Sequence, residues 1–515
     1  MKNYKYFIIV YSVFSLAAVL RIYHLGYNEL WFDEVFTYYQ TQSVTQLTSD
    51  IQGLLFPVLA NIWCKVFYFN EFNIRFSALI FGLLSLLFVY KLTKHLFNSK
   101  IAFISILLLS ISPLHIWYSQ EARGYTLYLF LSITSIYYLL KALENETFKC
   151  WIIFAVITVL NFCAYYASLL LLVPEGLFVL LYYRKFFKKW ILYSSGVIGV
   201  AIILYILYLK KSIGFYIYET GFWLPKLMFG SIINVFDNFN LGYNGSIPSY
   251  IFMRVISFVF MGLGIIKMWF ITKRSTIICC LFLFITLMTN ILISIVSNRS
   301  IFLTRMFFNI LPFYIIFVAA GIYSIRNNTI KTLVVISYLC ISLGSINNYF
   351  LNIMPAPINF HIGVHLKKPI SPLVNYIKGF NKEEILVGHT CVSTTLPYKY
   401  YYERNNKGPL KYEKIPYFFI PESNNKNKDY WDRFFVSNIR KGEEEDLIKG
   451  VNLNLIEEGV SSFPSQFWVL FSSWDKDGEL DKNSTRVLKW FKKRFYCHIT
   501  KQYKGILFVL FYKRN

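Results

Sequence analysis

The sequence is poor in acidic residues and in charge altogether. It has 28 Asp and Glu against 52 Lys and Arg, a formal net charge of +24, and only 16% charged residues against 56% hydrophobic ones. So basic a chain suggests a nucleic-acid partner. However, its Lys and Arg gather in short clusters between long apolar blocks, as in the cytoplasmic loops of membrane proteins. The composition therefore favours a membrane protein and argues against nucleic-acid binding.

Other signatures are also missing. The eight cysteines do not have the paired spacing of a metal site, and no internal repeat of the kind common in transporters is present. The C-terminal part has no phosphate-binding loop, catalytic triad or metal-spaced cluster. No small-residue cleavage site follows the first apolar block, which has Lys2 and Lys5 ahead of it. We therefore expect that block to be a retained transmembrane helix, not a cleaved signal peptide.

Long apolar blocks dominate the chain up to about Phe350. A bilayer core about 30 Å thick requires about 20 apolar residues per helix. Placing the basic clusters in the cytoplasm predicts about eleven transmembrane helices, with Leu54–Phe69 as an interfacial or re-entrant helix. The predicted fold is thus a polytopic α-helical membrane domain over residues 1–354, followed by a soluble extracytoplasmic α/β domain over residues 355–515. A bacterial inner (plasma) membrane is the expected location.

The α/β domain is predicted from alternating helix and strand patterns after about Ile370. Two helices are expected, of which the second is basic, together with three strands and a tyrosine-rich segment. The expected elements are a helix at Leu373–Lys378, a strand at Glu384–Gly388, the tyrosines at Tyr398–Tyr402, a strand at Phe467–Ser472, the basic helix at Ser484–Arg494 and a strand at Ile506–Tyr512.

Two acidic residues stand together in the loop after the first helix, in Leu30-Trp31-Phe32-Asp33-Glu34. Neighbouring carboxylates close to the lipid are costly unless they are used or paired. One of them could take a proton from an acceptor hydroxyl as a general base. Two solvated acids in an interfacial aromatic belt would give the same pattern, and composition alone does not separate these interpretations.

A second loop on the same side reads Ser112-Pro113-Leu114-His115-Ile116-Trp117-Tyr118-Ser119-Gln120-Glu121-Ala122-Arg123. Glu121 and Arg123 enter the next helix together. They could form an ion pair between helices, or they could line a polar cavity beside Asp33 in which Arg123 contacts phosphate. His115 follows a proline and precedes aromatics, which favours a structural imidazole over a ligand. Glu175, inside an apolar block, is either functional or locally paired at a helix break.

These loops carry a family resemblance. Leu30–Glu34, Ile74–Gly82 and above all Ser112–Arg123 resemble the motifs of the protein mannosyltransferase and aminoarabinose transferase superfamily, the GT-C glycosyltransferases. Further matching segments extend the resemblance over nearly the whole chain. They are Phe222-Trp223-Leu224-Pro225, Arg305 with Leu311-Pro312, Leu396–Tyr401 and Phe467–Leu470.

The resemblance implies a polyprenyl-phosphate-linked sugar as donor and inversion at the anomeric carbon, with Asp33 as catalytic base. Glu34 and Glu121 would bind the acceptor, a divalent ion or a neighbouring arginine, with Tyr118 and His115 beside them. Cations should neutralise the departing lipid phosphate. The candidates on the outer face are Arg123, Lys226, Arg299 and Arg305.

The chain departs from the family where many relatives have histidines. It has Leu55-Phe56-Pro57 and Ala164-Tyr165-Tyr166 at those places, so a divalent metal remains an open question. The acceptor implied is a glycan, a lipid or a protein. A transporter or flippase of lipid-linked sugars, which would need no base at Asp33, and a glycan polymerase or ligase are the alternative functions.

Overall fold

The computed structural model describes residues 2–42, 53–204, 206, 227–296, 302–357, 360, 363–364, 366–380, 387–389, 394–404, 417–419, 465–472, 480, 482–503 and 506–513. The chain folds into two compact units. The first contains Met1–Tyr27 and most of the chain from Gln40 to Gly363, and the second contains Asn28–Tyr39 and the chain from Val364 onward. Asn28–Tyr39, predicted as a loop of the membrane domain, therefore packs with the C-terminal part.

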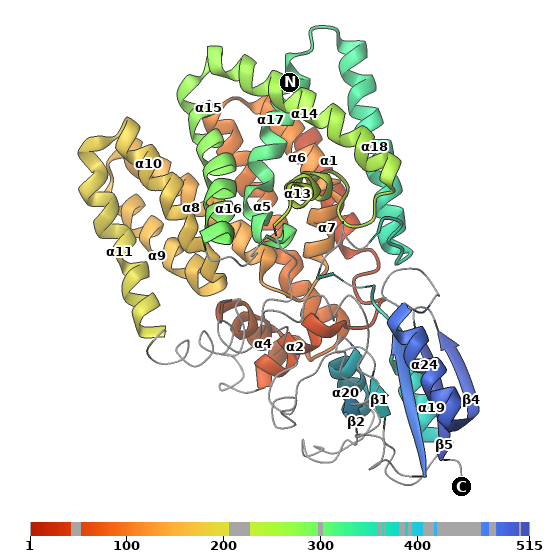
Figure 1. Cartoon of the computed structure of the whole chain (residues 1–515). Helices are drawn as coiled ribbons and strands as arrows, with labels where there is room; N and C mark the ends of the chain where they lie inside the picture. Colours follow the sequence, from red (N-terminus) through yellow and green to blue (C-terminus); the bar gives the residue numbers. More distant parts are fainter. Residues whose placement is uncertain are drawn as a thin grey trace. The chain divides into compact units, whose positions relative to one another are not determined.

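The first unit is built from helices throughout its described residues (Figure 1). Its amino-terminal half contains α1 (Lys2–Ile22), α4 (Leu55–Phe67), α5 (Glu71–Leu96), α6 (Ser99–Ser110), α7 (Pro113–Ser119), α8 (Tyr125–Asn145), α9 (Phe148–Ala164), η1 (Tyr166–Leu171), α10 (Leu172–Tyr182), η2 (Arg184–Phe186) and α11 (Phe187–Leu204). Its second half contains α13 (Phe229–Leu241), α14 (Ile247–Ile271), α15 (Lys273–Cys280), the π-helical turn η5 (Leu281–Ile285), α16 (Thr286–Val296), η6 (Thr304–Ile310), α17 (Leu311–Ser324) and α18 (Asn328–Phe350).

Among the described residues, seven helical segments are long and apolar enough to cross a membrane, and the pair α6–α7, bent by 64°, makes up to eight. Shorter apolar helices at Ile8–Ile22, Phe148–Ala164 and Tyr166–Tyr182 lie where the sequence predicts further crossings. The predicted polytopic helical fold is confirmed, while the count of eleven stays a prediction. Helix α4 has 13 residues, or about 20 Å at 1.5 Å per residue, too short for the bilayer core.

Local signals explain where several helices begin. The Asn70 side chain accepts from Asn73 N at 2.6 Å, and the Asn98 side chain accepts from the amides of Lys100 and Ile101 at 2.9 Å. Ser112 caps α7, with a proline in its first turn. These side chains satisfy amides that have no partner within the helix. They fix the turns that carry the chain from one apolar helix to the next.

Basic helix ends meet at one end of the first unit. His95 Nε2 in the last turn of α5 lies 3.0 Å from Glu144 near the end of α8, and Lys185 Nζ in η2 lies 2.7 Å from Glu146. Arg274, at the start of α15, lies over aromatic rings next to η2. In Figure 1 the junctions α14–α15 and α17–α18 lie at the top, and the junction α10–α11 lies at the upper left. The basic clusters that the positive-inside rule assigns to the cytoplasm therefore lie on one side of this unit. That this side faces the cytoplasm stays a prediction.

The described residues of the second unit form a five-stranded mixed sheet. Its strands are β1 (Val387–His389), β2 (Tyr417–Phe419), β3 (Gln466–Ser472), β4 (Phe495–Tyr503) and β5 (Ile506–Lys513), in the order β2-β1-β3-β5-β4. Strand β1 runs parallel to β2 and β3, whereas β5 is antiparallel to β3 and β4. The helices among the described residues of this unit are α2 (Phe32–Gln42, whose last residues pack with the first unit), α19 (Ser371–Phe380), α20 (Thr395–Arg404) and α24 (Lys482–Arg494).

Helix α24 covers one face of this sheet. Its buried Trp490 and Phe491 pack on Phe467 and Phe511 of β3 and β5, while Trp468 stacks on Phe508 at 4.3 Å on the opposite face. The predicted small α/β domain is confirmed. Strand β4 escaped prediction because its side chains are mostly exposed, and β2 because only three residues form it.

Candidate active site

The acidic motif opens α2. Glu34 is the third residue of this helix, and its Oε2 accepts a hydrogen bond from Trp31 N at 3.3 Å. This is the glutamate half of a capping box, in which a carboxylate in the first turn satisfies an amide at the start of the helix. Asp33 is only half-buried, whereas Glu34 is fully buried. The two neighbouring acids thus have different environments, and Asp33 is the more accessible of the two.

Glu34 also has a cationic neighbour that the motifs did not reveal. Lys367 Nζ lies 3.6 Å from Glu34 Oε2, and the two side chains are 5% and 0% exposed. A buried carboxylate is stabilised in its charged form by such a partner. The sequence assigns Glu34 to the acceptor, to an ion or to an arginine. The structure pairs it with a lysine of its own unit.

Residues on both sides of the motif bind the C-terminal part of the same unit. The Glu29 carboxylate accepts from Ile370 N at 2.7 Å and from Ser371 N at 2.9 Å, at the amino end of α19. Leu30 N donates to Tyr401 Oη of α20 at 2.8 Å. Further along α2, Tyr39 Oη donates to a carboxylate of α20, also at 2.8 Å. The segment Asn28–Tyr39, hereafter the acid segment, is therefore held at several points.

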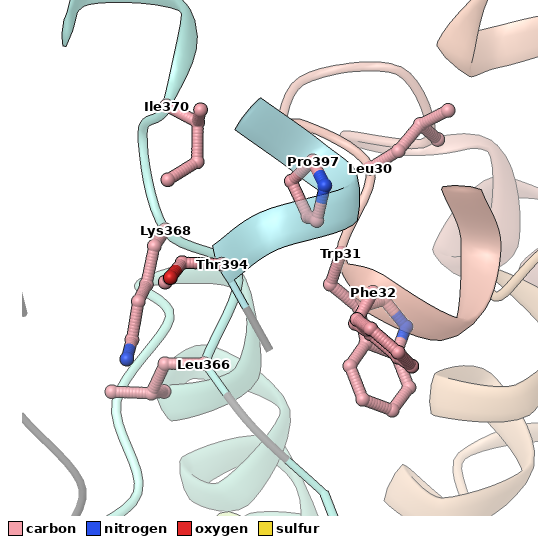
Figure 2. Close-up of a pocket in the computed structure, with 8 residues that line it drawn as sticks. All are labelled: Leu30, Trp31, Phe32, Leu366, Lys368, Ile370, Thr394 and Pro397. Atoms are coloured by element: carbon pink, nitrogen blue, oxygen red, sulfur yellow. The ribbon is translucent and has the colours of Figure 1, made fainter. Parts of the chain in front are cut away.

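A pocket lies against the start of α2 (Figure 2). The acid segment contributes aromatic and apolar side chains, and the connection before α19 contributes the cation Lys368. The start of α20 adds a hydroxyl and a proline. The lining residues are Leu30, Trp31, Phe32, Leu366, Lys368, Ile370, Thr394 and Pro397.

Lys399, in α20, is another buried cation of this unit. Its Nζ lies 3.7 Å from Glu403 and 5.1 Å from the centre of the Tyr39 ring. Burial lowers the pKa of Lys399 to about 8, and the Glu403 carboxylate opposes this shift. Nothing in the sequence separates Lys367 and Lys399 from the many other lysines, because their partners are distant along the chain.

The other predicted site residues belong to the first unit. Tyr118 Oη lies 2.5 Å from Tyr243 Oη, in the turn after α13, and Glu121 Oε2 accepts from Trp117 Nε1 at 2.7 Å. Arg123 is 5% exposed, and its backbone amide donates to the carbonyl of Glu121 at 2.7 Å. The loop after α7 therefore buries an acid and a base within one tight turn.

His115 is enclosed by polar groups of three helices. Its Nδ1 lies 2.8 Å from Arg21 Nη2, and its Nε2 lies 2.9 Å from Ser85 Oγ. Both ring nitrogens thus have partners, which favours the structural interpretation over a ligand. Arg21 also donates to the carbonyls of Leu109 and Ser110, at 3.2 and 2.8 Å, where α6 ends. The sequence did not predict these hydrogen bonds, because Arg21 stands in it only as a basic residue at the end of the first helix.

Of the other cations predicted to bind the donor phosphate, one lies among the described residues and two do not. Arg305, in η6, donates from Nη1 to Gly363 O at 3.4 Å. Lys226 and Arg299 lie outside the described residues, as does the motif Phe222–Pro225. Within the residues that the structure describes, no group of three or more His, Cys, Asp or Glu side chains is arranged to hold a metal ion.

The chain resembles one known protein family and several solved structures. Residues 52–208 match the family described as dolichyl-phosphate-mannose-protein mannosyltransferase. No curated protein has a sequence that matches the chain. The fold resembles that of ArnT from Cupriavidus metallidurans in the apo state, with a TM-score of 0.63 and 9% identity over 99% of this chain and 98% of that one.

Two further structures share the architecture. ArnT from the same organism bound to undecaprenyl phosphate has a TM-score of 0.61 at 10% identity, covering 97% of each chain. An Archaeoglobus fulgidus oligosaccharyltransferase tethered with an acceptor peptide has a TM-score of 0.50 at 12% identity, over 92% of this chain and 69% of that one. The resemblance to the GT-C superfamily of membrane glycosyltransferases is therefore confirmed, by the family match over residues 52–208 and by a shared fold over nearly the whole chain.

Proposed function

We propose that this chain is a membrane glycosyltransferase that moves a sugar from a polyprenyl-phosphate donor to an acceptor on the extracytoplasmic face. The observation that carries the proposal is the half-buried Asp33 at the start of α2, in a chain with the ArnT-like fold. One of the similar ArnT structures is bound to undecaprenyl phosphate, which supports a lipid-phosphate donor. The acceptor is a glycan, a lipid or a protein.

Asp33 is the general base of the proposed reaction. Its carboxylate takes the proton of the acceptor hydroxyl as that oxygen bonds to the anomeric carbon. The bond from this carbon to the phosphate oxygen breaks, its electron pair leaves with the polyprenyl phosphate, and the configuration inverts. A general base of this kind contributes about 10²- to 10⁴-fold to the rate. Glu34 is less suited to the role because it is fully buried beside Lys367.

The leaving group gains negative charge as the bond breaks, so cations near it lower the barrier. Arg123 and Arg305 are the described arginines proposed for this role, and Lys226 and Arg299 remain candidates from the sequence. Guanidinium groups suit the task because their planar fork matches phosphate oxygens. In this proposal Glu121 and Tyr118 support Arg123, because they belong to the same buried loop.

The face of the membrane follows from charge. The basic last turn of α5 and the basic η2 both pair with glutamates at the carboxyl end of α8, and the positive-inside rule assigns such a basic cluster to the cytoplasm. The acid motif follows the opposite end of α1, which supports an extracytoplasmic reaction and C-terminal unit in a bacterial inner membrane. Labelling a cysteine introduced near residue 425 from outside the cell, and not from the cytoplasmic side, is the expected result.

The central test replaces Asp33 by Asn in the full-length protein reconstituted in liposomes with a polyprenyl-phosphate sugar. We expect transfer to fall by at least about 100-fold, because the amide cannot accept the proton. Glu144→Gln, which changes a carboxylate near the carboxyl end of α8, is the matched control and should remain active. Full activity of a folded Asp33→Asn protein would refute the assignment.

The same assay tests the loop after α7. Glu121→Gln and Arg123→Ala should both weaken transfer strongly. Unchanged kinetics in both variants would make these side chains purely structural. The lipid-linked sugar that accumulates when the gene is deleted would identify the donor, and movement of that lipid across the membrane without transfer would point to a flippase instead.

A further inference from the structure

Three carboxylates of the acid segment have different surroundings. Glu29 caps the amino end of α19, Glu34 lies in a buried pair with Lys367, and Asp33 between them is half-buried. Charged groups are not buried without a partner, because taking them out of water costs several kcal/mol per ion. The partners of the two flanking acids come from one short stretch, residues 367–371.

That stretch thus contacts the segment on both sides of Asp33. On the amino-terminal side, two consecutive backbone amides bind Glu29 at the positive end of the α19 dipole. On the carboxyl-terminal side, the Lys367 ammonium lies 3.6 Å from Glu34 Oε2, and the same oxygen accepts from Trp31 N. The Lys367 charge therefore acts on the carboxylate that fixes the first turn of α2, the turn on which Asp33 stands.

We propose that Lys367 is a positioning residue for the reaction, which holds the first turn of α2, and with it Asp33, through its buried ion pair with Glu34. This inference rests on the proposed role of Asp33 as the base. In this arrangement Glu34 does not touch the substrate, and the second acid of the motif serves the first. The C-terminal unit is then part of the catalytic machinery, because it supplies the cation that orients the base.

A double-mutant cycle tests the pair. Lys367→Met leaves the Glu34 carboxylate buried without this cation, and Glu34→Gln leaves the ammonium without this anion. The double variant Glu34→Gln/Lys367→Met removes both charges, and the glutamine oxygen still accepts from Trp31 N. We expect each single variant to lower kcat, and the double variant to be at least about tenfold more active than the product of the two losses predicts. Lys367→Arg, which keeps the charge, should retain most of the activity.

Deuterium exchange of the acid-segment amides supplies a readout that does not depend on activity. Lys367→Met should speed exchange at residues 30–36, and the double variant should slow it again. The matched control is Lys489→Met, which removes an exposed lysine of α24 in the same unit and should leave this exchange unchanged. A purely global loss of stability would instead raise exchange throughout the sheet.

Two outcomes overturn the inference. Loss of activity in Glu34→Gln together with a wild-type kcat in Lys367→Met would show that Glu34 acts on the substrate and not through Lys367. Strictly additive losses, with unchanged exchange at residues 30–36, would show that the pair does not position α2. Failure of the proposed function is distinct from either. In that case Asp33→Asn stays active while the exchange data still report coupling between Glu34 and Lys367. If a single variant does not fold, recovery of folding and transfer in the double variant still supports the pair.

Discussion

The crossing of α14 and α17 provides a sharp test of the membrane fold, because it depends on two glycines. A Cβ added at Gly264 of α14 would lie 2.0 Å from the carbonyl oxygen of Phe317, and one added at Gly321 of α17 would lie 2.0 Å from that of Phe260. Contacts under 3.0 Å essentially never occur for a real Cβ. Since the obstacle is backbone, no side-chain rotation relieves it.

The substitution is Gly264→Ala. Bringing the 2.0 Å contact to 3.0 Å requires the two helices to separate locally by about 1 Å, which loosens the packing on either side of the crossing. Overpacking of this kind costs typically about 1–3 kcal/mol, and a backbone obstacle places Gly264→Ala at the upper end of that range. Because α17 follows η6 directly, the shift should also disturb Arg305 and lower transfer.

The matched control is Gly262, two residues before Gly264 in α14. An added Cβ at Gly262 meets nothing within 4 Å, so Gly262→Ala gains only the helix propensity of alanine, about 1 kcal/mol at most. The assay is thermal unfolding of the purified protein in detergent. The quantity measured is the fraction of protein that remains monodisperse after heating. Gly264→Ala should melt well below the wild type and Gly262→Ala at or above it. Equal melting temperatures for the two variants would refute the close crossing.

Two further predictions concern buried cationic and titratable groups. Arg21→Met should destabilise the protein strongly, because each carbonyl left without its donor at the end of α6 costs about 1–3 kcal/mol. Arg21→Lys should restore little of this stability, because an ammonium cannot reproduce the guanidinium fork. A lysine variant that melts like the wild type would contradict this. In β1, burial lowers the pKa of His389 from 6.5 to about 3, so the unfolded state binds the extra proton as pH falls below 6.5. The C-terminal unit should therefore lose about 2 kcal/mol between neutral pH and pH 5, seen as faster deuterium exchange in β3, and His389→Gln should flatten this dependence.

Much of the helical architecture could be predicted because its signals are local. Apolar length and the basic clusters located the long helices of the membrane region. Alternating apolar runs likewise located β3 and β5. Strand β4 carried no such signal, because a strand with mostly exposed side chains lacks an apolar face.

In the candidate site, too, local signals were predictable and long-range contacts were not. Asp33, Glu121 and Arg123 could be singled out because unusual polar residues follow one another beside apolar helices. Their partners could not, because burial and pairing join residues far apart. Glu29 binds an amide 341 positions away, and Arg21 binds His115 across 94 positions.

By itself, then, the sequence determined where the chain is apolar enough to enter a membrane and which acids accompany that boundary. Only the tertiary structure decided that residues 28–39 pack with the C-terminal unit, that Glu34 lies beside Lys367, and that Arg21 holds the break between α6 and α7. The physical reason is that helix formation depends on neighbouring residues, whereas the cost of a buried charge is met by whichever partner the fold brings within a few ångströms.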